Sequence, residues 1–105
     1  MSVTEVSSVM NLNQFVEENN VVVVDFAAPA WCVPCQRLAP HFEAVSEKIE
    51  GVKFLSVDID TADSDLVELF HVQGVPTVLA FKDGELLGTV EGRTAPKLVS
   101  EISSL

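Results

Sequence analysis

The sequence predicts an α/β fold in which a mixed central sheet of four to five strands is flanked by four helices. Two continuous apolar and β-branched runs, Val21–Phe26 and Val52–Ile59, predict strands that are covered on both faces. A stretch with helical periodicity separates them, as expected for a crossover between parallel strands. The dipeptide Asp83-Gly84 between two further strand patterns indicates a hairpin, which adds antiparallel strands.

The first half of the chain follows this pattern element by element. A short strand is expected within Thr4–Val9, and Asn11–Val16 belongs to a first helix. Asn11 can cap that helix, with Gln14 in the position of a capping box. After the strand Val21–Phe26, an amphipathic helix runs from Pro34 to about Glu50 and contains Pro40, which should kink it. Its apolar face is formed by Leu38, Phe42, Val45 and Ile49.

The second half continues with a short helix over Asp63–Phe70, capped by Thr61 or Ser64. Strands over Thr77–Phe81 and Glu85–Val90 flank the hairpin turn. The last helix spans Thr94–Leu105, with Pro96 in its first turn. Its apolar face is formed by Leu98, Val99, Ile102 and Leu105.

Length and composition place this pattern in one domain, residues 1–105, with 48% hydrophobic residues to build a core. The net charge of −10 disfavours nucleic acid and anionic membranes as partners. The first residues show no basic segment followed by an apolar one, so we expect no signal peptide. Two cysteines in such a chain fit a reducing compartment, and we expect a cytoplasmic location.

The segment Trp31-Cys32-Val33-Pro34-Cys35 contains both cysteines. A disulfide across so short a loop is expected to be strained and exposed, and such disulfides are typically catalytic or regulatory. The CxxC spacing also occurs in zinc sites, but zinc usually needs four ligands, and His41 and His71 do not have finger spacing. An inert pair of core cysteines is the third interpretation. Dithiol–disulfide exchange without a metal or another cofactor is the favoured one.

The two cysteines have different expected roles. Cys32 follows a buried strand and opens a helix, where free N–H groups and the helix dipole stabilise a thiolate, so it is the candidate nucleophile. Cys35 lies one turn further along and should be more buried. In the expected reaction Cys32 forms a mixed disulfide with the substrate, and Cys35 then attacks Cys32 and releases the reduced substrate.

Two other positions are candidates for the same site. Asp25 is a charge inside an apolar strand, where burial would raise its pKa and allow it to relay a proton for Cys35. A strand-end carboxylate that reaches solvent is an equally good interpretation from position alone. Pro76 in Gly74–Thr77 opens a strand, where a trans bond would have no special role. A cis bond there would expose the backbone of Val75 as an edge that could dock a peptide.

The chain resembles the thioredoxin family over nearly its whole length. The matching segments are Val24-Asp25-Phe26, Trp31-Cys32-x-Pro34-Cys35, Ala39-Pro40, Val57-Asp58-Ile59-Asp60, Gly74-Val75-Pro76-Thr77, Phe81-Lys82-Asp83-Gly84 and Gly92. The resemblance implies the thioredoxin fold, a protein-disulfide reductase activity in electron transport and cell redox homeostasis, and a monomer recharged by thioredoxin reductase.

The resemblance also assigns residues. It implies that Asp25 is the buried proton relay and that Pro76 is a cis-proline facing the sulfurs. It places Trp31, Val75, Pro76 and Gly92 in an apolar substrate groove, to which the motif residues Val33 and Pro34 contribute. The chain departs from the family pattern in having Val33 where glycine is usual, Ser56 where a lysine often partners the acid, and a segment Ala27–Ala30 that is one residue longer.

Two rival functions stay open at this point. One is a glutaredoxin-like or disulfide-isomerase-like oxidoreductase, which the unusual Val33 allows. The other is a binding module that uses the fold as a scaffold independently of redox chemistry. The choice of reductant separates the first rival from a reductase, and the activity of a variant lacking both cysteines separates the second.

Overall fold

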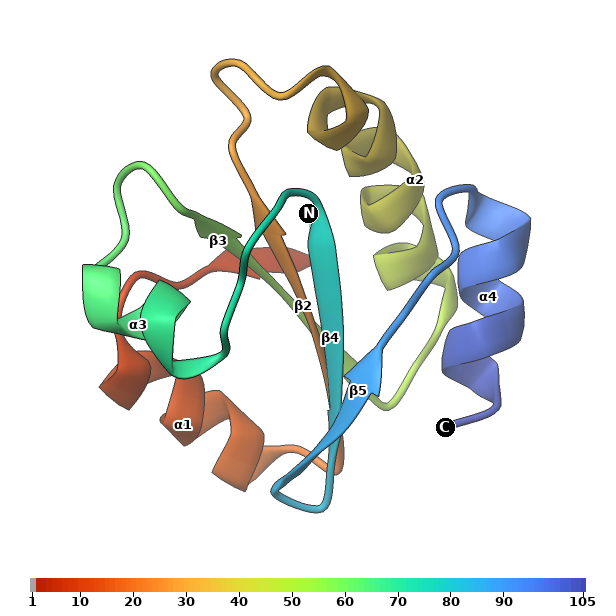
Figure 1. Cartoon of the computed structure of the whole chain (residues 1–105). Helices are drawn as coiled ribbons and strands as arrows, with labels where there is room; N and C mark the ends of the chain where they lie inside the picture. Colours follow the sequence, from red (N-terminus) through yellow and green to blue (C-terminus); the bar gives the residue numbers. More distant parts are fainter. Residues whose placement is uncertain (1) are drawn as a thin grey trace.

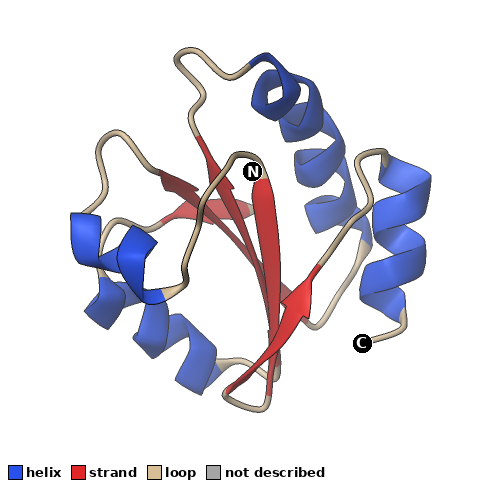
Figure 2. Cartoon of the chain, viewed as in Figure 1, coloured by secondary structure: helices blue, strands red, loops and turns tan. Residues whose placement is uncertain are grey.

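The computed structural model describes residues 2–105, which form a five-stranded sheet with helices on both faces (Figures 1 and 2). The elements are β1 (Val3–Glu5), α1 (Val9–Glu18), β2 (Val21–Ala27), α2 (Val33–Lys48), β3 (Val52–Asp58), α3 (Ser64–Leu69), β4 (Thr77–Lys82), β5 (Glu85–Thr89) and α4 (Ala95–Ser103). The predicted class, a mixed sheet flanked by four helices, is confirmed.

Strand β2 is the centre of the sheet, whose strand order is β1-β3-β2-β4-β5. It pairs in parallel with β3 and antiparallel with β4, so the crossover through α2 and the late hairpin meet on the same strand. Helices α1 and α3 cover one face, and α2 and α4 cover the other (Figure 1). This arrangement explains why the whole of β2 except its ends is buried.

The side chains of β2 alternate between two cores, as the strand period requires. Val22, Val24 and Phe26 pack into the core beneath α1 and α3. Val23 packs with Leu38, on the opposite face, beneath α2 and α4. Asp25 follows in the same alternation and lines a cavity with residues of α2, so the one charge of this strand points at the helix that carries the cysteines.

Several helix starts differ from the sequence prediction. Ser8, not Asn11, caps α1, because the Ser8 hydroxyl accepts the N–H of Asn11 and the helix therefore begins one turn earlier. Gln14 consequently does not stand in a capping box. Helix α3 begins after Asp63, and neither Thr61 nor Ser64 is its cap.

Other boundaries shift with less consequence. The first strand is formed by Val3–Glu5, at the start of the expected range. Helix α2 continues through Pro40 as one element.

The hairpin between β4 and β5 follows the prediction. Asp83 and Gly84 both have positive φ, at 52° and 85°, which is the combination that a type I′ turn requires. Aspartate tolerates this region better than most residues, and glycine adopts it without steric cost. The hairpin is thus specified by its two turn residues.

Helix α4 is held by contacts from outside its own sequence. Its N-cap residue, Thr94, makes no side-chain cap, and the N–H of Ala95 instead donates to Nδ1 of His41 on α2 at 3.0 Å. The N–H of Gly92 donates to Oε1 of Glu101. The first bond fixes the start of α4 against the middle of α2, and the second ties the chain before α4 to α4 itself.

Gly92 should be intolerant of a side chain. A Cβ at this position would lie 2.9 Å from Oε1 of Glu101 and 3.0 Å from backbone atoms of α4. We predict that Gly92→Ala lowers the free energy of unfolding in urea by about 1–3 kcal/mol. The matched control is Gly74→Ala, where a Cβ meets nothing within 4 Å, and its cost should stay within about 0.5 kcal/mol. Equal costs would contradict the close approach.

Candidate functional site

The cysteine pair lies at the start of α2, after the segment that connects β2 to this helix. Cys32 is the N-cap of the helix, and its sulfur accepts the N–H of Cys35 at 3.2 Å. The two residues form a disulfide, with their Cα atoms 5.2 Å apart. Upstream, the carbonyl of Ala28 accepts the N–H groups of both Trp31 and Cys32, which holds the longer connecting segment in a compact turn. The prediction that Cys32 opens a helix is confirmed.

The sulfurs are less exposed than the sequence predicted. Cys32 is 4% exposed and Cys35 is 2% exposed, and both pack with Ala28 and Val75. The expected order of burial holds, but the expectation of an exposed disulfide was wrong. Part of this cover comes from Val75, in a loop far along the chain.

The loop that covers Cys32 is the segment Gly74–Thr77, which the sequence analysis singled out as a candidate docking edge. The carbonyl oxygen of Val75 lies 3.8 Å from Sγ of Cys32. The Val75–Pro76 peptide bond is cis, as the resemblance implied. Thr77 closes the loop by donating from its hydroxyl to the carbonyl of Gly74 at 2.6 Å. The structure therefore brings the sulfur of Cys32 and the Val75 backbone to one place.

Exposed apolar side chains flank the cysteines in the sequence. Trp31 is 60% exposed and Val33 is 50% exposed, and Pro34 between the cysteines is exposed as well. Nε1 of Trp31 donates to a carboxylate oxygen of Asp60 at 2.9 Å, which fixes the indole as a platform at the surface. The sequence analysis did not connect Asp60 to the site, although the indole N–H of Trp31 needs a hydrogen-bond partner.

Gly92 is present near the site but is buried against Glu101. The exposed residue at this point is Arg93, whose guanidinium donates to the carbonyls of Val90 and Gly92 at 3.0 Å and of Pro76 at 3.5 Å. Sequence reasoning missed Arg93, because an arginine in a loop carries no local sign of its neighbours. A cation is thus added to a groove that was expected to be apolar.

Asp25 is buried beneath α2. It is 5% exposed, and its Oδ1 has no hydrogen-bond partner among residues 2–105. Burial raises the pKa of Asp25 from 3.8 to about 6, and the positive charge of Arg93 opposes this rise. Of the two sequence interpretations, the buried acid is confirmed and the solvent-facing one is wrong.

A cavity of about 280 Å³ adjoins Asp25 and is lined by Ala39, Phe42 and Ser56 among others. Ala39 lies one helical turn after Cys35, so the cavity places the carboxyl near the helix face that carries the second sulfur. Ser56 stands opposite Asp25 in the strand register, where the family often has lysine. A neutral hydroxyl there leaves Arg93 as the cation that acts on Asp25.

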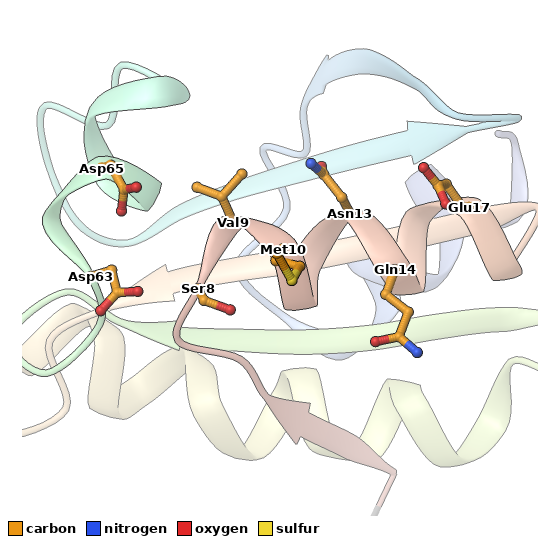
Figure 3. A pocket seen from close by; sticks show the side chains of 8 residues that line it. All are labelled: Ser8, Val9, Met10, Asn13, Gln14, Glu17, Asp63 and Asp65. Carbon is orange, nitrogen blue, oxygen red and sulfur yellow. The ribbon is translucent and has the colours of Figure 1, made fainter.

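A separate hollow of about 860 Å³ lies at the start of α1 (Figure 3). Figure 3 shows Asp63 and Asp65 at one end of this surface and Glu17 at the other, with Met10 between them. Its lining includes no candidate site residue. Within residues 2–105 no group of His, Cys, Asp or Glu side chains is arranged to hold a metal ion. No helix of the described chain is long and apolar enough to cross a membrane.

Comparison with known proteins agrees with this geometry. The family model described as Thioredoxin matches residues 3–104. The mitochondrial thioredoxin 3 of Saccharomyces cerevisiae, in its oxidized form, superimposes with a TM-score of 0.88 at 29% identity, covering 99% of this chain and 96% of that one.

Two curated relatives are longer than this chain. Thioredoxin-2 of Pyricularia oryzae is 33% identical over 104 residues, covering 99% of this chain and 60% of that protein. Protein disulfide isomerase-like 1-3 of Arabidopsis thaliana is 38% identical over 91 residues, covering 86% of this chain and 16% of that protein. The chain thus spans only part of the length of these relatives.

The pKa of Asp25 predicts a pH dependence of stability. Between pH 3.8 and about 6 the folded state holds this proton more tightly than the unfolded state does, so the free energy of unfolding falls as pH rises through this window. Asp25→Asn should not show this fall. The difference in free energy of unfolding between Asp25→Asn and wild type should therefore increase by up to about 3 kcal/mol from acid to neutral pH. Urea unfolding at a series of pH values measures the difference.

Two variants sharpen this test. Asp65→Asn removes an exposed carboxylate and should keep the slope. Arg93→Gln removes the charge that lowers the pKa of Asp25 and should move the midpoint to higher pH. A wild-type slope retained in Asp25→Asn would show that another group causes it.

Proposed function

The chain belongs to the thioredoxin family, and on this premise we propose that it reduces disulfides in protein substrates through Cys32 and Cys35. The observation that carries the proposal is the disulfide at the N-terminus of α2, in which the sulfur of Cys32 accepts the N–H of Cys35. The same N–H can donate to a thiolate once the disulfide is opened, and the helix dipole adds to this stabilisation. Cys32 is therefore the proposed nucleophile.

The first step is attack on the substrate. The thiolate of Cys32 attacks one sulfur of the substrate disulfide, a new S–S bond forms, and the other substrate sulfur leaves as a thiolate that takes a proton from solvent. The backbone of Val75, beside the sulfur of Cys32, is the proposed docking edge for the substrate chain. Trp31, Val33, Pro34 and Pro76 supply the apolar surface around it.

The second step releases the substrate. The thiol of Cys35 gives its proton to the carboxylate of Asp25, and its sulfur attacks Sγ of Cys32. The mixed disulfide breaks, and the second substrate thiolate departs. With a pKa of about 6, Asp25 is mostly ionised at neutral pH and can accept the proton. Because this pKa lies within about one unit of neutral pH, Asp25 can also give the proton back. Two electrons have then passed to the substrate, and the pair is oxidised as in this structure.

We propose that thioredoxin reductase supplies the electrons that reopen the disulfide, and that the sulfur pair works without a further cofactor. We also propose that the chain acts as a cytoplasmic monomer in cell redox homeostasis and electron transport. The family assignment and the acidic charge of −10, which disfavours nucleic acid and anionic membranes as partners, support this setting.

A second candidate function is disulfide isomerisation or oxidation. The Arabidopsis thaliana relative is named a protein disulfide isomerase-like protein, and Val33 lies exposed between the cysteines. The residues between two cysteines influence the relative stability of dithiol and disulfide. A measured reduction potential near that of thioredoxins, about −270 mV, favours the reductase, and one near that of disulfide isomerases, about −180 mV, favours this alternative.

The function is tested by assaying the reduction of a protein disulfide with either thioredoxin reductase and NADPH or glutathione as reductant. We expect turnover with the reductase, loss of turnover in Cys32→Ser, and accumulation of a mixed disulfide in Cys35→Ser, because the resolving sulfur is missing. Turnover with glutathione alone would favour a glutaredoxin-like enzyme. Full biological activity after both cysteines are replaced by serine would favour the scaffold function.

The assignment of the nucleophile is tested separately on the reduced protein. At mildly acid pH a thiol-alkylating reagent should label Cys32 before Cys35, because Cys32 is the N-cap of α2, where its thiolate is stabilised. Mass spectrometry of the peptides measures the order. Preferential labelling of Cys35 would reverse the two roles.

A further inference from the structure

A pocket of about 330 Å³ begins at the redox motif itself. It is lined by Pro34, Arg37, Leu38, His41, Arg93 and Thr94, and we call it the arginine pocket. The first four of these residues repeat at helical spacing, so one face of α2 forms one wall. The segment that leads into α4 forms the other wall. Pro34, between the two cysteines, is shared by this pocket and the motif.

The charge of the arginine pocket is opposite to that of the molecule. The whole chain has 16 acidic residues and 6 lysines and arginines. The lining of the pocket nevertheless contains two arginines and no carboxylate, and both arginines are exposed. A local concentration of positive charge in an acidic protein attracts an anion to that place.

Each polar side chain of the pocket can donate a hydrogen bond. Nδ1 of His41 accepts the N–H of Ala95, so the hydrogen of the neutral ring is on Nε2, where it can be donated. The hydrogen-bond acceptors of Arg93 are the neutral carbonyls of Val90, Gly92 and Pro76, and these bonds leave further N–H groups of its guanidinium for a ligand. Arginine donors match a carboxylate in geometry and charge.

Arg93 connects the pocket to the proposed docking edge. The guanidinium of Arg93 reaches the carbonyl of Pro76, and the neighbouring carbonyl of Val75 lies 3.8 Å from Sγ of Cys32. A peptide whose cysteine is joined to Cys32 would therefore have its nearby side chains beside Arg93. The positive charge of Arg93 also acts on Asp25, whose pKa it lowers. Asp25 is buried, however, and does not line the pocket.

We propose that the arginine pocket binds a carboxylate of the disulfide substrate and so gives the reaction a preference for an acidic group next to the substrate disulfide. The carboxylate is a glutamate or aspartate side chain of a protein, or a carboxylate of glutathione disulfide. The inference rests on the proposed disulfide exchange and adds a substrate class to it. At longer range the charge of −10 repels acidic proteins, so the preference is for a local carboxylate.

The test uses short peptides that contain an internal disulfide and differ at one residue beside a cysteine, which is glutamate, glutamine or lysine. At low ionic strength we expect kcat/KM for the glutamate peptide to exceed that for the glutamine peptide by about fivefold, mainly through KM. The lysine peptide should be the poorest substrate. Raising the salt to about 0.5 M should reduce the preference.

Variants locate the preference. Arg37→Gln and Arg93→Gln should each bring the ratio of glutamate to glutamine kcat/KM toward one. Comparing two substrates on the same variant removes any effect of Arg93 on Asp25. Lys48→Gln is the matched control, because it removes one positive charge at the far end of α2 and should keep the ratio.

The outcomes separate the inference from the function on which it rests. Failure to reduce any peptide would contradict the proposed function. If the wild-type protein reduces all three peptides at equal rates, the proposed carboxylate preference of the arginine pocket is wrong and the proposed disulfide reductase function still holds. Glutathione disulfide is assayed as a further substrate. If Arg37→Gln reduces it more slowly than the wild type does, glutathione is supported as a source of the carboxylate. If the two proteins reduce it equally and the peptide preference is present, protein side chains are supported as the source.

Discussion

The hydrogen bond from the N–H of Cys35 to the sulfur of Cys32 links the architecture of this protein to its chemistry. A helix N-terminus leaves N–H groups without partners, and serine, threonine, aspartate or asparagine commonly supply the acceptor. In α2 a sulfur occupies that position. The atom that completes the helix is therefore the atom proposed to attack the substrate, and as a thiolate it would be the stronger acceptor. Helix stability and thiolate stability reinforce each other in the reduced state.

The central strand of the sheet leads into this helix start, and it also contains a buried carboxyl that lowers the stability of the fold at neutral pH. Strand β2 is covered on both faces, and its only charge, Asp25, is directed at α2. Desolvation outweighs the attraction of Arg93, so the pKa of the carboxyl rises to about 6. With Ser56 opposite, no lysine compensates the charge from the neighbouring strand position. The buried carboxyl of Asp25 thus lowers the stability of the fold at neutral pH, and its proposed role as proton acceptor for Cys35 would account for its place beneath α2.

Local patterns in the sequence predicted much of the fold. The apolar run of β2, the periodicity of α2 and the turn at Asp83-Gly84 are each specified by neighbouring residues, and all three are confirmed. The start of α1 was misplaced because Ser8 and Asn11 are both good caps, and their side chains alone do not decide between them. Similarity to a family supplied the cis-proline, which has no local signature.

The environment of the site could not be predicted in the same way, because it is assembled from distant segments. The cover over the sulfur of Cys32 comes from Val75, 43 residues away, and this contact explains why the disulfide is less exposed than expected. His41 caps a helix that begins 54 residues later. Arg37 and Arg93 meet at one pocket for the same reason. Periodicity places side chains on a face of an element, but only packing decides which faces meet.

The anchoring of Trp31 to Asp60 gives the molecule a built-in optical probe. The chain has one tryptophan and no tyrosine, so its intrinsic ultraviolet emission arises almost entirely from the indole that adjoins Cys32. That indole is held in one orientation by a carboxylate and is still open to solvent. A change in emission on reduction, or when a substrate covers the platform, therefore reports the state of this site without a label.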